Sequence, residues 1–564
     1  METQVAVQPA SERQWLWLRQ SGACVLLFLI VDALTSARFI ADTVSYAIAI
    51  QKHDFSDFGH LLWYPLAALV NTGLAPLLRG WLHLGALGEI IWTEMFLDWA
   101  AGLGCALLLH ALLRRFCPRE WVIWLATAAF LCTHAFLNLF QAGVSYVPGL
   151  AMLLLGYWCL LRRDAAHWGW AVAAGIALGC CIGFWVPYLW GVPAALAAPL
   201  LFYGFTQTQR RNVMVAMLLL AVTVGAIFLT GAAHQGVRSV ADFRAWVAES
   251  SHGANSSGIP RAALGLARSY LHLGNDGLLF KRYLVHDPYN PVGASELLRA
   301  SFWKVALFYA ALALLLWTLW RKQDGRRFLW LWLLAAIPVC GFGVAWQGGD
   351  MERYLALLPP MYLGFGYALA QASGKSLARV GLTAFCLMLI GVNLTATRNA
   401  MALTDTQKIE QRVADLPTRI APQSMVFTVN KQDELFAFTR TFPFHPLNQG
   451  KALPVYSLAE LGTTQVTVWR QEFAQAALRI WQAHGEVWVS ARVRSPRPQS
   501  GWYWAEGADP EISWKHLHEF FAPLESSATV GSTDGFVLLP PTEANRARLA
   551  TFTLGHQLAA QSGH

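Results

Sequence analysis

The chain has 564 residues, of which 55% are hydrophobic and 13% are charged. Soluble globular domains carry roughly 25% charged residues, so this composition excludes an ordinary soluble protein. The formal net charge of +8 would suit a nucleic-acid-binding protein, but the Lys and Arg residues lie in small clusters between apolar blocks. They do not form the basic stripe or face that binds a nucleic acid. We therefore expect a membrane protein with no nucleic-acid partner.

Long apolar blocks dominate the first 400 residues or so. A membrane-spanning helix needs about 20 mostly apolar residues. The start METQVAVQPASERQ lacks the charged region and cleavage site of a signal peptide, so we expect the first block to be a retained helix. The pattern predicts an α-helical polytopic membrane protein with about eleven spans, near residues 21–40, 89–113, 121–140, 143–161, 168–184, 187–205, 212–232, 302–320, 328–346, 352–370 and 380–397.

Basic residues fall in every second connection between these blocks. Examples are Arg114 with Arg115, and Arg210 with Arg211. The positive-inside rule places such clusters in the cytoplasm. An odd number of spans with a cytoplasmic N-terminus then sends the C-terminal region to the outer side, together with residues 41–88 and 233–301. We expect a bacterial inner (plasma) membrane protein whose C-terminal domain is periplasmic or extracellular.

The composition changes near residue 400. SMVFTVN, TQVTVWR and EVWVSARV alternate as strands do, whereas AQAALRIWQAHG and SWKHLHEFFAPL have helical periodicity. Alternating elements predict a small α/β domain. None of the nine cysteines lies there, so this domain needs no disulfide bonds. The expected division is a membrane domain, residues 1–399, and an extracytoplasmic α/β domain, residues 400–564.

The first outer loop is rich in acidic, basic, histidine and tyrosine side chains, which can take part in catalysis or binding. Residues 41–65 read ADTVSYAIAIQKHDFSDFGHLLWYP and follow the first span directly. The next run, LAALVNTGLAPLLRGWLHLG, is amphipathic and too polar to span, which predicts one or two helices lying in the membrane interface. Such helices can wall a groove that is open to lipid, as a lipid-linked substrate requires.

Two segments resemble a known superfamily. In the first, Asp42 lies just after the first span, Tyr46 follows four residues on, and a His-x-x-x-Tyr-Pro segment comes next. The second is DMERYLALLPP at 350–360. Both are similar to motifs of the GT-C superfamily of polyprenyl-phosphate-sugar-dependent glycosyltransferases. This superfamily includes lipid A aminoarabinose transferases, protein O-mannosyltransferases and mycobacterial arabinofuranosyltransferases. The resemblance in layout covers about residues 15–400.

The resemblance implies transfer of a sugar from a polyprenyl phosphate to a periplasmic acceptor hydroxyl on a glycan, a lipid or a pilin or other protein, with inversion. Such a reaction needs a base for the acceptor proton and cations for the leaving phosphate. By resemblance Asp42 is the base, although it could instead only cap the helix that begins near Thr43. No cofactor is required, and the donor, the acceptor and membrane lipids are the expected partners.

Cations near the outer face are candidate ligands for the donor phosphate. Arg353 is the first candidate, because a guanidinium offers paired donors to phosphate oxygens. It could instead pair with Glu352 or Asp350 at the interface. Lys52, in the first outer loop, is the second candidate.

The remaining candidates for contact with the substrate are Tyr46, Asp54, His60, Tyr64, Glu94 and His286. Glu94 shares a helix face with Asp98, so the two acids could line an outward-facing cavity, pair structurally or couple an ion. The spacing of His53, Asp57 and His60 would allow a divalent metal ion, but without a fixed fourth ligand we do not favour a metal site.

The chain departs from the superfamily pattern at one point, and its sequence leaves two alternative functions open. Many superfamily members carry a second acid in the next outer loop, whereas this chain has Ser145 and Tyr146 there. A transporter or flippase for lipid-linked saccharides would show internal repeats and functional charges at mid-membrane on several helices. The sequence shows no such repeat, and its charges gather toward one face. A non-catalytic assembly protein for envelope polysaccharide is the other alternative, and only activity separates it from a transferase.

Overall fold

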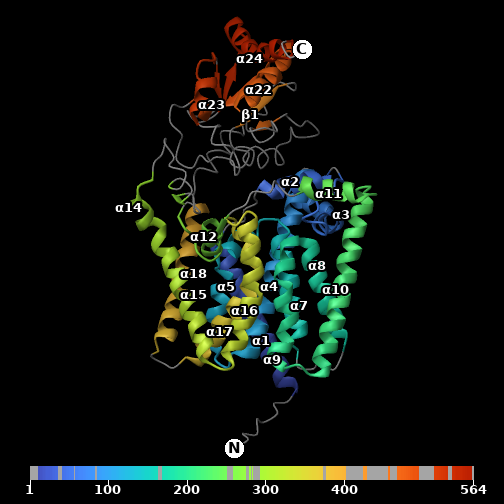
Figure 1. The fold of residues 1–564 in the computed structure, drawn as a ribbon, viewed down its shortest axis with the longest axis vertical. Helices are drawn as coiled ribbons and strands as arrows, with labels where there is room; N and C mark the ends of the chain where they lie inside the picture. Colours follow the sequence, from blue (N-terminus) through green and yellow to red (C-terminus); the bar gives the residue numbers. More distant parts are fainter. Residues whose placement is uncertain are drawn as a thin grey trace, which may run out of the picture.

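Figure 1 shows a computed structural model of the chain, which is mostly helical with a small sheet near the C-terminus. The structure describes residues 10–35, 41–51, 53–55, 57–82, 86–162, 168–250, 258–274, 279–280, 283, 292–372, 376–401, 424–428, 455–457, 466–494, 514–526, 528–530 and 536–561.

Each of the expected spans coincides with a helix or with consecutive helices. In chain order these are α1 (Ala10–Leu34), α4 (Ala86–Phe116), α5 (Glu120–Leu131) with α6 (His134–Leu139), α7 (Tyr146–Leu160), α8 (Gly169–Phe184), η1 (Val186–Trp190) with α9 (Val192–Tyr203), α10 (Gln207–His234), α14 (Ala294–Leu297) with η3 (Leu298–Phe302) and α15 (Trp303–Arg321), α16 (Gly325–Ala345), η4 (Met351–Leu357) with α17 (Leu358–Gln371), and α18 (Leu377–Met401).

Six helical segments within the described residues are long and apolar enough to cross a membrane, and three shorter apolar helices accompany them. The expected fold class, an α-helical multi-pass membrane protein, is confirmed. The span predicted at 121–140 is divided, because α5 ends at Leu131 and α6 begins at His134. The first helix lies earlier than predicted and ends at Leu34.

Short helices from the two expected outer loops lie at one end of the bundle. They are α2 (Ala41–Gln51), α3 (Trp63–Leu82), α11 (Val240–Ser250) and α12 (Gly258–Tyr270), and Figure 1 shows them at the end that faces the C-terminal sheet. The predicted interfacial run forms the single helix α3, with Pro76 inside it.

The basic connections bring other parts of the chain together. The Arg119 guanidinium donates to the carbonyl of Ala372 (3.3 Å), and that of Arg379 lies 4.9 Å from the ring centroid of Trp121. Arg162 stacks on two indoles, of Trp158 and Trp170. Arginine and tryptophan together are typical of the membrane interface.

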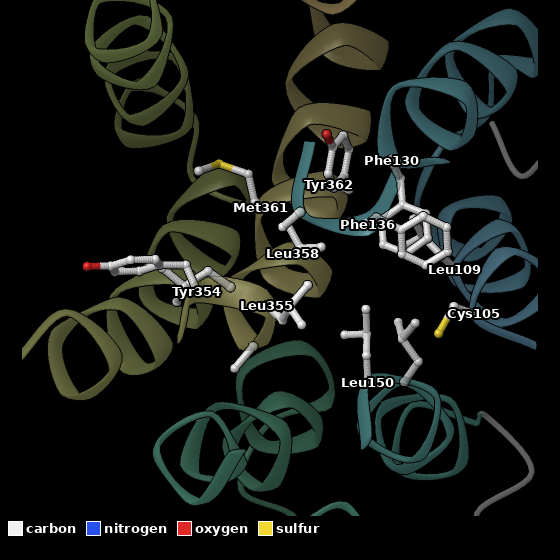
Figure 2. Close-up of a cluster of buried hydrophobic side chains, with 14 of the residues drawn as sticks. Cys105, Leu109, Phe130, Phe136, Leu150, Tyr354, Leu355, Leu358, Met361 and Tyr362 are labelled. Atoms are coloured by element: carbon white, nitrogen blue, oxygen red, sulfur yellow. The ribbon is translucent and has the colours of Figure 1, made fainter. Parts of the chain in front are cut away.

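The core of the bundle is built where α4, α5, α6, α7, η4 and α17 meet. Two buried phenols in it are bonded to the backbone: Tyr362 donates to the carbonyl of Ala129 (3.0 Å), and Tyr354 donates to the carbonyls of Ala262 (2.8 Å) and Gly348 (2.7 Å). The bonds of Tyr354 anchor η4 to α12 and to the segment after α16, and the bond of Tyr362 anchors α17 to α5. Figure 2 labels the side chains that pack here, Cys105, Leu109, Phe130, Phe136, Leu150, Tyr354, Leu355, Leu358, Met361 and Tyr362.

Glycines allow α8 and α10 to pack closely. A Cβ on Gly179 would lie 2.6 Å from the Cβ of Thr223, and a Cβ on Gly175 would lie 2.5 Å from the carbonyl oxygen of Ala216. Small residues spaced four apart let membrane helices approach in this way. By contrast, nothing lies within 4 Å of a Cβ placed on Gly225 of α10.

We expect Gly179→Ala to lower the free energy of unfolding by about 1–3 kcal/mol, because the added methyl group overpacks the contact between α8 and α10. Gly225→Ala, also in this helix pair, should leave stability unchanged or raise it by up to about 1 kcal/mol through helix propensity. Thermal unfolding of both variants in detergent measures the difference. Equal unfolding temperatures would refute the packing argument.

The described part of the C-terminal region is a five-stranded sheet with three α-helices and one short 3-10 helix. The strand order is β2-β1-β3-β5-β4, in which β1 pairs in parallel with β2 and β3, and β5 pairs antiparallel with β3 and β4. Phe427 and Phe473 lie in its core. The elements are β1 (Met425–Thr428), β2 (Val455–Ser457), α22 (Val466–Gln482), β3 (Val487–Ser490), η7 (Ala491–Arg494), α23 (Trp514–Phe521), β4 (Ala528–Val530), β5 (Phe536–Leu539) and α24 (Glu543–Gln561).

One predicted strand of this region is wrong. TQVTVWR contains the first residues of α22, which begins at Val466. Its alternating β-branched residues suggested a strand, but they are continuous with the amphipathic run that follows, and Phe473 and Trp481 of the same helix are buried in the core. Tertiary burial of the helix face therefore outweighs local propensity.

Candidate functional site

The side chain of Asp42, in α2, is hydrogen-bonded to a residue of another helix, α7. It lies in the first turn of α2, which begins at Ala41, so it is not the N-cap residue. A carboxylate in the first turn is favoured by the helix dipole. The side chain of Asp42 is half-buried, and its Oδ2 accepts a hydrogen bond of 3.0 Å from the hydroxyl of Tyr146. Because Tyr146 begins α7, the bond fixes the carboxylate against the bundle.

His60 is the centre of a buried hydrogen-bond network between α2 and α3. Its Nδ1 lies 2.6 Å from Oγ of Ser145 and 3.2 Å from the carbonyl oxygen of Phe184, and its Nε2 lies 3.0 Å from the hydroxyl of Tyr46. A carbonyl oxygen only accepts, so Nδ1 carries the proton and Nε2 accepts from Tyr46. Burial lowers the pKa of His60 despite the opposing effect of Asp57. The imidazole is therefore neutral at physiological pH.

Asp57 organises the turn that leads into α3. Its Oδ1 accepts from the backbone N–H of Gly59 (2.8 Å), and its Oδ2 accepts from the hydroxyl of Tyr64 (3.2 Å). The same Oδ2 lies 4.0 Å from Nε2 of His60. The ring of Tyr64 packs edge-on against Tyr46, with centroids 5.3 Å apart. Tyr46 is thus hydrogen-bonded to His60 and packed against Tyr64, so the three side chains lie together.

The connection between α6 and α7 carries the residues that hold the first outer loop. Asp98 of α4 fixes this connection, because its Oδ2 accepts from the backbone N–H groups of Gly143 (2.9 Å) and Val144 (3.1 Å). Gly143 has a φ of +76°, and a Cβ there would lie 2.8 Å from Cγ2 of Thr43. Only glycine lets the connection pass so close to α2 in that conformation.

Arg353 is a buried cation enclosed by indole rings. It is 7% exposed, and its guanidinium carbon lies 4.0 Å from the ring centroid of Trp346 and 5.2 Å from that of Trp185. Its Nη2 donates to Oε1 of Gln347 and lies 3.9 Å from Oε1 of Glu352. Within the described residues, its Nε has no hydrogen-bond partner. Pairing with Glu352, expected as the alternative, is therefore present but leaves the guanidinium incompletely satisfied.

Asp42 and Arg353 are linked through a pair of aromatic rings. Tyr146 is bonded to Asp42, and its ring centroid lies 4.9 Å from that of Trp185, over which Arg353 stacks. Both charged groups also act electrostatically on His60 and on Tyr146. The structure therefore connects both side chains to one pair of aromatic rings, and their predicted roles stay predictions.

Glu94 does not reach the surface. It is 0% exposed, its Oε1 accepts from Nε1 of Trp63 (2.9 Å), and its Oε2 has no partner among the described residues. Asp54, another predicted contact, is exposed. Lys52 and His286 lie outside the described residues, so their predicted roles stay predictions.

The described residues between Ala41 and Tyr64 do not gather a metal-ligand set. Among the described residues, no three His, Cys, Asp or Glu side chains are placed to hold a metal ion together. His53 instead packs edge-on against Phe55, with centroids 6.4 Å apart, while Asp57 bonds Tyr64.

Sequence analysis missed several residues that shape this neighbourhood. Trp185 lies between the spans predicted at 168–184 and 187–205, and Trp346 and Gln347 just precede the 350–360 motif. Gln347 has a φ of +42°, which is uncommon for a residue other than glycine. Arg268 of α12 donates to the carbonyl of Gly349 (2.9 Å) and so holds the same segment. Proximity to the 350–360 motif was an available signal for Trp346 and Gln347, whereas Trp185 and Arg268 lie far in sequence from both motifs.

The arrangement of helices defines a GT-C fold, as the sequence resemblance predicted. No protein-family model and no curated protein matches the sequence. Among solved structures, the chain is similar to ArnT from Cupriavidus metallidurans bound to undecaprenyl phosphate, with a TM-score of 0.53, 12% identity, and coverage of 94% of this chain and 98% of that one. The apo state of the same protein matches with a TM-score of 0.52, 10% identity and the same coverage.

The lowered pKa of His60 predicts a pH dependence of stability. Because the unfolded state binds a proton more readily than the folded state, stability falls as the pH drops below about 6.5, the usual value for histidine. His60→Gln should lessen this loss. Thermal unfolding of both proteins between about pH 5 and pH 8 checks it. A loss of stability at low pH that is equally large in the His60 variant would contradict the prediction.

Proposed function

We propose that the protein is a membrane glycosyltransferase that transfers a sugar from a polyprenyl-phosphate donor to an extracytoplasmic acceptor hydroxyl. The observation that supports the proposal is the chain of contacts that links a carboxylate, Asp42, to a buried guanidinium, Arg353, through Tyr146 and Trp185. The fold similarity to ArnT, which has been solved with undecaprenyl phosphate bound, supports a donor of the same class.

The chemistry assigned to Asp42 is general-base catalysis. The acceptor oxygen attacks the anomeric carbon as its proton passes to the Asp42 carboxylate. The bond from that carbon to the phosphate oxygen breaks, and its electron pair leaves with the polyprenyl phosphate. A single displacement inverts the anomeric configuration. A base must lie within hydrogen-bonding reach of the attacking group, and a half-buried carboxylate at the start of α2 is suited to this.

Arg353 is assigned to the leaving phosphate. A guanidinium stabilises the charge that develops on phosphate oxygens as the glycosidic bond breaks. Its Nε lacks a protein partner, and its contact with the Gln347 amide is one that a phosphate oxygen can replace. Stacking between two indoles fixes the plane of the guanidinium, so little side-chain entropy is lost when the phosphate binds.

Asp42→Asn should abolish sugar transfer, by at least about 1,000-fold, while donor binding and folding persist, because the amide cannot accept the proton. Transfer is measured as release of labelled sugar from polyprenyl-phosphate-linked arabinofuranose and mannose into acceptor-containing membranes. Asp324→Asn, at the far end of the bundle before α16, is the matched control and should transfer normally. Full transfer by the Asp42 variant would remove Asp42 from the mechanism.

Arg353→Ala should weaken binding of undecaprenyl phosphate by about tenfold or more, because one charge-assisted phosphate contact is lost. Arg162→Ala is a matched control, since Arg162 also stacks between two indoles but lies in a connection at the other end of α7. Binding is measured by the quenching of intrinsic tryptophan fluorescence on titration with the lipid phosphate. Unchanged affinity in the Arg353 variant, or equal losses in both, contradicts the phosphate role.

The transporter alternative has a distinct outcome in the same assays. A flippase would bind the lipid phosphate and move the intact lipid-linked sugar between leaflets, with no cleavage of the bond to phosphate. Movement without release of sugar would therefore favour the alternative over the transferase.

A further inference from the structure

We propose that Tyr146 is a positioning residue that orients the Asp42 carboxylate for catalysis, in place of the second acid that this connection lacks. The inference rests on the proposed function and concerns the same site. Its physical basis is a hydroxyl from one helix bonded to the carboxylate of another, at 3.0 Å. Among the described residues, Tyr146 is the one that hydrogen-bonds the Asp42 side chain.

The hydroxyl of Tyr146 selects one oxygen of the carboxylate. Because Oδ2 accepts the phenolic hydrogen, Oδ1 is left to receive the proton of the acceptor hydroxyl. Without this bond the half-buried carboxylate is free to rotate about its Cβ–Cγ bond, and the productive geometry is lost for much of the time. A misplacement of about 1 Å at a reacting group can cost about 100-fold in rate.

The tyrosine itself is rigidly placed. It is 6% exposed, and its ring packs against His60 and Trp185, with centroids 5.8 Å and 4.9 Å away. Its backbone carbonyl accepts a hydrogen bond of 2.6 Å from the hydroxyl of Tyr188. The connection that precedes it is fixed by the bonds from Asp98. A side chain whose ring, backbone and neighbours are all fixed can orient a carboxylate at little entropic cost.

Tyr146 also links the proposed base, Asp42, to the cation proposed to bind the donor phosphate, Arg353. Its ring contacts Trp185, and Trp185 contacts the guanidinium of Arg353. One aromatic pair therefore sets the separation between the group that takes the proton and the group that stabilises the leaving phosphate. A neutral phenol does this without adding a negative charge beside the donor phosphate, which a second carboxylate would do.

The test is Tyr146→Phe, which removes the hydroxyl and keeps the ring. We expect kcat to fall by about 10- to 100-fold while KM for the polyprenyl-phosphate donor changes by less than about twofold. In a double-mutant cycle, the substitution should have no further effect in the Asp42→Asn background. Tyr157→Phe is the matched control, because Tyr157 is a buried phenol of the same helix whose hydroxyl has no partner within the described residues.

The outcomes separate the inference from the proposed function. If Asp42→Asn abolishes transfer but Tyr146→Phe transfers at the full rate, the positioning role is refuted and the transferase stands. If Tyr146→Phe raises KM and lowers the unfolding temperature without changing kcat, Tyr146 is only structural. If Asp42→Asn itself transfers normally, the proposed function fails.

A spectroscopic readout tests the hydrogen bond without any activity. The carboxylate stretching band of Asp42 is the infrared band that disappears in Asp42→Asn. It should shift in Tyr146→Phe and stay in place in Tyr157→Phe. An unshifted band in the Tyr146 variant overturns the inference whatever the protein transfers.

Discussion

The candidate site depends on one buried carboxylate that takes no part in the proposed chemistry. Oδ2 of Asp98 accepts two backbone N–H groups of the connection between α6 and α7. Buried backbone donors must be paired, and in a membrane no water is at hand to pair them. The connection therefore lies where Asp98 holds it, and it delivers Ser145 to His60 and Tyr146 to Asp42. The segment that contains α2 and the start of α3 is thus positioned by contacts with the bundle.

Much of the helical fold followed from the sequence, because membrane-spanning helices have a strong one-dimensional signal. The helix from Gln207 to His234, for instance, contains a long apolar run after its polar first turn. The break between α5 and α6 could not be predicted, since it depends on Thr133 and Tyr362 meeting across the bundle. The strand predicted at TQVTVWR was wrong because the burial of Phe473 on one face of α22 is a tertiary effect.

The candidate site was predictable in its residue types and unpredictable in its partners. Asp42 stood out because an acid follows the first span directly, but its partner Tyr146 is 104 residues away. Asp98 could be read as a cavity acid or as a structural one, and only the structure shows that Gly143 and Val144 bind it. Such pairings arise from helix packing, which no local pattern encodes.

The same contacts bear on the choice between a transferase and a transporter. Coupling ions or substrates in transporters bind near the middle of the membrane, on side chains that are free to exchange partners. Of the acids within α4, Asp98 is held by two backbone N–H groups and Glu94 by Trp63, and both are 0% exposed, although one oxygen of each has no partner among the described residues. The incompletely bonded guanidinium of Arg353 and the half-buried Asp42 lie instead near one end of the bundle. Polar groups concentrated at one end suit chemistry on a substrate at one face of a membrane, and they do not suit passage through it.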